Sequence, residues 1–120
     1  MSRGEQFEDL LVWQKSMALT TQIYRLCQQG ALSKDWGMRD QMQRAAVSIA
    51  ANIAEGYERG GRKEYIQFLN IAKCSVGELR CLVTIASRLH YADGIVLKSL
   101  SDNSEEISRM LKGLISSLRP

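Results

Sequence analysis

Five polar side chains of one alanine-rich stretch have a spacing that could support chemistry. Arg44, Ser48, Asn52, Glu55 and Arg59 recur at steps of three and four, which places them on one narrow arc of a helix at about 100° per residue. A catalytic interpretation makes Glu55 a general base or a metal ligand. A structural interpretation pairs Glu55 with Arg44 or Arg59 and lets Ser48 and Asn52 hydrogen-bond to a neighbouring helix.

The structural interpretation is favoured, because the arc offers Glu55 no catalytic partner. General acid–base or metal chemistry needs a second acid, a histidine or a cysteine beside it, and none shares this arc. We therefore expect Ser48, Asn52 and Glu55 to hold the second helix against its neighbours. Glu55→Ala should then clearly lower the melting temperature.

The remaining candidates fit no catalytic constellation. His90 is the single histidine, so a di-iron site built from Glu-x-x-His pairs has too few ligands. Residues 83–85 are Val-Thr-Ile and lack the arginine that a helical ribonuclease places before its histidine. The turn Gly60-Gly61-Arg62-Lys63 lacks the strand and the spacing of a phosphate-binding loop. The sequence predicts no catalytic residue, metal or cofactor, and hence no enzyme.

Basic residues suggest a different kind of site. The net charge of +3 and the pI near 8.9 permit a nucleic-acid partner without requiring one. An anionic backbone would be bound by charge, and the alternative is an ordinary solvated flank. The candidates for binding RNA or DNA are Arg39, Arg44, Arg59, Arg62, Lys63, Lys73 and Arg80.

The elements that must position these residues are helices. Gly, Ser and Asp cluster near residues 30–35, 60–61 and 92–94 and separate four segments with helical periodicity. Short turns between long helices predict an all-α fold, an antiparallel up-down-up-down four-helix bundle, as one domain over residues 1–120.

The expected helices differ in how well their limits are defined. The second spans about 35–59 and the third about 62–90, whereas the fourth begins either after Asp93-Gly94 or near residue 101. In the first, the stripe expected to face the core consists of Leu10, Trp13, Met17, Thr20, Tyr24 and Cys27.

The third helix carries more apolar surface than one core can take. Its inward stripe includes Leu69, Val76 and Val83, and a second stripe lies across the helix. A patch of that size usually marks association, so we expect a homo-oligomer, with packing inside one bundle as the alternative. The expected interface consists of Ile71, Cys74, Glu78, Cys81, Leu82 and Ile85.

Composition points to the cytoplasm. No apolar run reaches the roughly 18 residues that cross a bilayer, and the N-terminus MSRGEQFEDLL lacks the apolar stretch of a secretory signal. The three cysteines are scattered and odd in number, which is typical of reduced thiols rather than of a disulfide framework.

Four stretches resemble a known family: FEDLLVW (7–13), QMQRAAVSIAANIAEG (41–56), RKEYIQFLNIA (62–72) and SVGEL (75–79). Together they resemble the bacterial four-helix-bundle proteins encoded in intervening sequences of large-subunit ribosomal RNA genes, which are related to the accessory variability proteins of diversity-generating retroelements. The family's Asn-Ile-Ala-Glu-Gly motif falls on residues 52–56 and its Ser-x-x-Glu-Leu motif on residues 75–79, with no chemistry assigned to either. Arg80-Cys81 stands where the family often has Glu-Thr, which makes this flank more basic.

The resemblance implies an antiparallel bundle, no recognised catalytic activity, a ring-like homopentamer, and binding of RNA or other nucleic acid. Together with the residues themselves, it predicts a non-enzymatic, oligomeric bundle protein that binds RNA or DNA through a basic surface. The alternative is a structural or protein-partner adaptor with no role in nucleic-acid binding.

Overall fold

The computed structural model describes residues 6–120, and four long helices account for most of them. A short 3-10 turn, η1 (Phe7–Asp9), precedes α1 (Leu11–Leu26), and a second, η2 (Gly30–Lys34), leads into α2 (Trp36–Glu58). Then follow α3 (Arg62–Arg88) and α4 (Gly94–Leu118), and residues 6–120 contain no strand. The predicted all-α four-helix fold is confirmed. Residues 1–5, part of the stretch expected to lack a secretory signal, lie outside the described residues.

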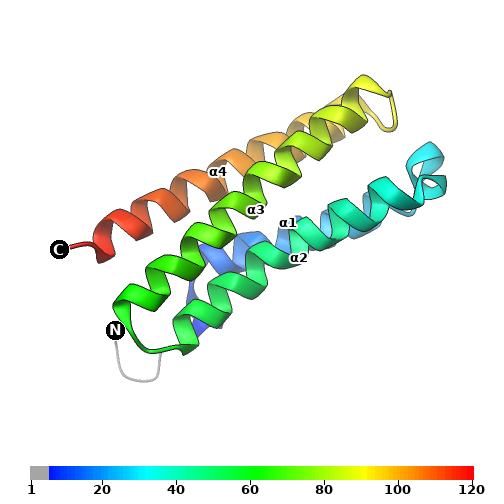
Figure 1. The fold of residues 1–120 in the computed structure, drawn as a ribbon. Helices are drawn as coiled ribbons and strands as arrows, with labels where there is room; N and C mark the ends of the chain where they lie inside the picture. The colour runs from blue at the N-terminus through cyan, green and yellow to red at the C-terminus, as the bar shows by residue number, and fades with distance from the viewer. Residues whose placement is uncertain (1–5) are drawn as a thin grey trace.

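The helices pack side by side as an elongated bundle of 46 × 22 × 21 Å. Each helix contacts the next along the chain, and α4 also contacts α1, which closes the arrangement. Figure 1 shows the chain reversing direction between successive helices, so the α2–α3 turn and the end of α4 lie at one end of the bundle. The α1–α2 and α3–α4 connections lie at the other end.

Aspartates mark where two helices begin. The Asp35 carboxylate accepts a hydrogen bond from the Met38 amide (3.1 Å) and caps α2, and Asp93 likewise accepts one from the Ile95 amide (2.7 Å). Such caps satisfy amides that a helix leaves unpaired in its first turn. The fourth helix therefore begins at Gly94, the earlier of the two starts that the sequence allowed.

One hydrophobic core runs through all four helices. Each helix contributes fully buried side chains to it, for example Leu19 of α1, Ile49 of α2, Leu79 of α3 and Leu111 of α4. Small residues let α2 and α3 approach closely: a Cβ added at Gly56 would lie 2.6 Å from the Phe68 Cβ. The glycine therefore fixes the spacing of these two helices.

The expected core stripe of the first helix is only partly correct, because Leu10 and Trp13 pack against the core and Cys27 belongs to it, but Met17 and Tyr24 do not. Met17 and Tyr24 are each 40% exposed, and Leu10, Trp13 and Thr20 are only partly buried, so Cys27 alone of that stripe is fully buried. The buried side chains are instead Val12, Ser16, Leu19, Ile23 and Leu26. Both sets repeat at steps of three and four, and periodicity alone cannot tell which of them faces α2 and α4.

Candidate nucleic-acid interface

The polar arc of α2 meets α3 at a pair of serines. Ser48 Oγ and Ser75 Oγ lie 2.8 Å apart and share a hydrogen bond between the two helices. The Asn52 side-chain amide donates to the Ser48 carbonyl (2.8 Å) and to Ser48 Oγ (2.9 Å). Ser48 therefore ties α2 to α3 directly, and Asn52 acts on that contact only through Ser48.

Glu55 forms one of the two ion pairs expected from the sequence, but it does not bond to a neighbouring helix. Its carboxylate pairs with Arg59 of the same helix at 2.9 Å, and both side chains are about half exposed. An exposed pair four residues apart on a helix contributes about 0.3–0.5 kcal/mol. Glu55→Ala should therefore lower the melting temperature only slightly, in contrast to the sequence-based expectation, because Glu55 is bonded within α2 and not to a neighbouring helix.

Three of the basic candidates gather at the α2–α3 turn. Arg59 ends α2, with its guanidinium 5.0 Å from the centre of the Phe68 ring, while Arg62 and Lys63 open α3 with exposed side chains. Within the described part of the chain, Arg62 and Lys63 form no ion pair. Their charges are therefore available to an anionic partner.

The other four candidates lie elsewhere. Arg39 is partly buried at the opposite end of α2, where it donates to the Ser33 carbonyl (2.8 Å) and stacks on Trp36. Arg80 pairs with Glu105 of α4 at 3.2 Å, and Lys73, two turns earlier, shares that side of α3.

Arg44, the last of the four, is exposed on α2 and pairs with Asp40 at 2.8 Å. The seven residues therefore do not form one continuous basic surface. About four turns of α2 or more separate Arg44 and Arg39 from the cluster at the α2–α3 turn, and Lys73 and Arg80 face α4.

A shallow groove between α1 and α2, of about 590 Å³, contains residues that the sequence placed differently. Tyr24 of α1 lines it together with Gln43, Arg44, Val47 and Asn52 of α2. Sequence reasoning missed this groove because it assigned Tyr24 to the core. The better signal was the neighbouring stripe of Val12, Leu19 and Ile23, which is richer in aliphatic side chains.

The second stripe of α3 is largely exposed in the single chain. Ile71 is 47% and Ile85 39% exposed, and Cys74, Glu78 and Cys81 are exposed as well. We call these five residues the α3 face. Leu82 does not belong to it, because it is 6% exposed and is part of the core, so the expectation that it lies in an interface is wrong.

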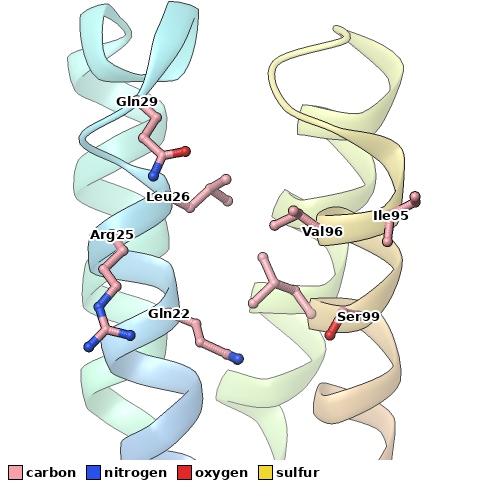
Figure 2. A pocket seen from close by; sticks show the side chains of 8 residues that line it. Gln22, Arg25, Leu26, Gln29, Ile95, Val96 and Ser99 are labelled. Carbon is pink, nitrogen blue, oxygen red and sulfur yellow. The ribbon is translucent and has the colours of Figure 1, made fainter.

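A pocket of about 420 Å³ opens between α1 and α4 at the end of the bundle that holds their connections. Leu26, Val96 and Leu100 form its apolar wall, and Gln22 and Arg25 lie at its rim. Figure 2 shows Gln22 and Leu26 of α1 and Val96 of α4 projecting toward the space between the two helices, whereas Arg25 and Ile95 point away from it. The pocket has no cluster of titratable groups and is shaped for an apolar group rather than for chemistry.

The described residues supply no obvious reactive centre. Residues 6–120 contain no group of three or more His, Cys, Asp or Glu side chains that could hold a metal ion. Burial raises the pKa of the Cys27 thiol, which keeps it protonated and a poor nucleophile. Burial also raises the pKa of Tyr65 to about 12, so its hydroxyl is not a base at neutral pH. No helix among these residues is long and apolar enough to cross a membrane.

The fold and these surfaces define a small all-α bundle protein with no recognisable catalytic centre among the described residues. The chain belongs to the 23S rRNA-intervening sequence protein family, whose family model matches residues 8–113. That match confirms the resemblance seen in the four sequence stretches, and it indicates no catalytic family. No curated protein matches the chain.

A solved structure supports the same assignment. The chain is similar to a protein of unknown function from the S23 ribosomal protein family of Bacteroides thetaiotaomicron, with 28% identity and a TM-score of 0.80. The similarity covers 88% of this chain and 98% of the other. The whole bundle, and not one helix pair, is therefore shared.

Proposed function

We propose that this protein is a non-enzymatic bundle that self-associates and binds RNA or other nucleic acid. The observation that carries the binding proposal is the cluster of Arg59, Arg62 and Lys63 at the α2–α3 turn, where two of the three charges are unpaired within the described residues. Exposed cations at a protruding turn can approach a phosphate backbone without desolvating a folded surface.

Self-association is proposed from the α3 face. A single bundle leaves Ile71 and Ile85 partly exposed on one helix side, beside two exposed thiols. Several copies would also bring several basic turns together, so that many weak phosphate contacts act at once. The family resemblance implies a ring of five, and the native mass of the purified protein tests that number.

The binding proposal is tested with a single-stranded RNA, a double-stranded RNA and a DNA of equal length at two salt concentrations. Affinity should fall steeply with salt, and replacing Arg59, Arg62 and Lys63 by glutamine should reduce the slope of log K against log salt by about 2–3. Lys73→Gln with Arg80→Gln is the matched control, because those residues face α4, and should change the slope little. Absence of binding at low salt would remove nucleic acid from the proposal.

A protein-partner adaptor is the second candidate, favoured by one specific observation. Ile95 is 81% exposed beside the pocket between α1 and α4, next to the partly exposed Val96. An apolar group of another protein could cover both side chains and fill the pocket. The adaptor would be favoured if the protein bound no nucleic acid and if its native mass were that of a single chain.

A further inference from the structure

Two exposed apolar surfaces lie on adjoining sides of the bundle, one on each side of α2. The first is the α3 face. The second, which we call the α1–α2 face, consists of Met17, Tyr24, Val47 and Ala51. Tyr24, Val47 and Ala51 line the same groove, and Met17 lies two turns before Tyr24 on the same side of α1. Neither surface is needed for the core of its own chain.

The two surfaces lie at the same height along the bundle. The Ser48–Ser75 bond joins α2 to α3, and the hydrogen bond from the Thr20 hydroxyl to the Ala46 carbonyl (3.2 Å) joins α1 to α2. These two bonds fix the relative heights of the three helices, so the height of any other residue follows from its distance in sequence. At 1.5 Å per residue, Tyr24 and Cys81 both lie about 9 Å from the serine pair toward the α3–α4 turn. Met17 and Cys74 both lie about 1.5 Å from it in the opposite direction.

Charges on the two sides match as well. Counted in the same way, Glu78 of α3 lies about 4.5 Å and Arg44 of α2 about 6 Å from the serine pair in the same direction. Glu78 is exposed and forms no ion pair within the described residues. The Arg44 side chain is 79% exposed and pairs, among these residues, only with Asp40 of its own helix, which is also exposed at the surface. Near the other end of the bundle, exposed Lys63 of α3 and exposed Glu58 of α2 differ in height by about 3 Å.

We infer that the α3 face of one copy docks on the α1–α2 face of the next copy, with Glu78 opposite Arg44. The inference rests on the self-association part of the proposed function and names its contact. A head-to-tail contact closes into a ring only if neighbours are not shifted along the axis, and surfaces at equal heights satisfy that condition. Neighbouring sides of a four-helix bundle meet at about a right angle, so the ring closes after about four or five copies with α2 nearest its axis.

Disulfide trapping tests the contact directly. In a chain carrying Met17→Cys and Cys81→Ser, mild oxidation should link Cys74 of each copy to the new thiol of the next. Met17 and Cys74 lie on different sides of α2, so the bond forms between chains. The product should be a ladder of linked chains that ends at the number of copies in the ring. Adding Cys74→Ser should remove the ladder, and Ile95→Cys in place of Met17→Cys, an exposed site on α4, should give none.

Charge reversal gives an independent measurement. Arg44→Glu or Glu78→Arg alone should shift the native mass toward the single chain, and the two changes together should restore the assembly. A bond between Arg44 and Glu78 within one chain would not produce this result, because the native mass reports only contacts between chains. Circular dichroism of each variant should give the helix content of the unchanged protein, which excludes unfolding as the cause.

Three outcomes overturn the inference. An oligomeric native mass without the Met17–Cys74 ladder leaves self-association standing and removes this docking. Linked dimers without larger species indicate a twofold contact instead of a ring. A single-chain mass at all concentrations removes the docking and the proposed self-association together, and the nucleic-acid measurement is unaffected.

Discussion

The α2–α3 seam and the α1–α4 seam of the same bundle are built differently. Along α2–α3, Gly56 lies against Phe68 so closely that a methyl group does not fit, and the Ser48–Ser75 bond joins the helices near their middle. Along α1–α4, the links are an exposed Lys15–Glu106 pair at 3.0 Å and a long hydrogen bond of 3.4 Å from Asn103 to Gln22. A pocket of about 420 Å³ opens at one end of that second seam.

This difference follows from side-chain size. Alanine, serine and glycine on α2 let two backbones come close, so packing is dense and sensitive to small changes in volume. Long polar side chains on α1 and α4 bridge a wider gap with contacts that water weakens. The α2–α3 seam should therefore carry more of the stability, and the α1–α4 seam should be easier to open.

The largest effect is expected at Gly56. Gly56→Ala places a Cβ 2.6 Å from the Phe68 Cβ and 3.3 Å from the Tyr65 carbonyl oxygen, and should lower the free energy of unfolding by about 1–3 kcal/mol. Gly77→Ala is the matched control, since a Cβ there meets nothing within 4 Å and alanine favours a helix by up to about 1 kcal/mol. Urea denaturation measures both, and equal destabilisation by the two changes would contradict the close approach.

An intermediate loss of stability is expected when one polar contact of each seam is removed, and the two losses compare the seams directly. Ser48→Ala leaves the buried Ser75 hydroxyl without its partner across the seam and should cost about 1 kcal/mol of unfolding free energy. Lys15→Ala removes the exposed pair of the other seam and should cost less than about 0.5 kcal/mol, even less at high salt. If Lys15→Ala were the more damaging change, the comparison between the seams would be reversed.

The smallest effect concerns the end of the bundle where the α1–α4 pocket opens. The pKa of the Asp35 carboxyl is lowered, first by the Met38 amide and then by the Tyr91 hydroxyl, which bonds to it at 2.8 Å. Because the pKa of Asp35 in the folded protein lies below its unfolded value of about 3.9, the ionised carboxylate stabilises the fold at pH values above that unfolded value. This stabilisation is lost as the pH falls through the pKa of the folded protein.

Melting curves from pH 6 to pH 2 should therefore show less acid destabilisation in Asp35→Asn than in the unchanged protein. Asparagine can still cap α2, so the variant should remain folded. Tyr91→Phe should have an intermediate acid sensitivity, because it removes only the second cause of the lowered pKa. An identical pH profile in all three proteins would exclude Asp35 as a contributor.

The family motifs and helical spacing predicted most of the fold, but less of the candidate site. Glycine, serine and aspartate clusters located all three helix connections, and Asp93 located the start of α4 at one of two expected places. The core-facing stripe of α1 was assigned to a neighbouring side of the helix, because two stripes of α1 have the same periodicity. The seven basic residues shared a charge but not a position, and only three of them meet at the α2–α3 turn.

The sequence by itself determined which residues are helical and where the helices end, because caps, glycines and periodicity act over a few residues. It also determined the family, through motifs spread over most of the chain. Only the tertiary structure decided that Ser48 bonds to Ser75 of α3, that Leu82 is buried and that Tyr24 is not. These depend on which neighbour covers each helix side, and that is set by the packing of segments far apart in the chain.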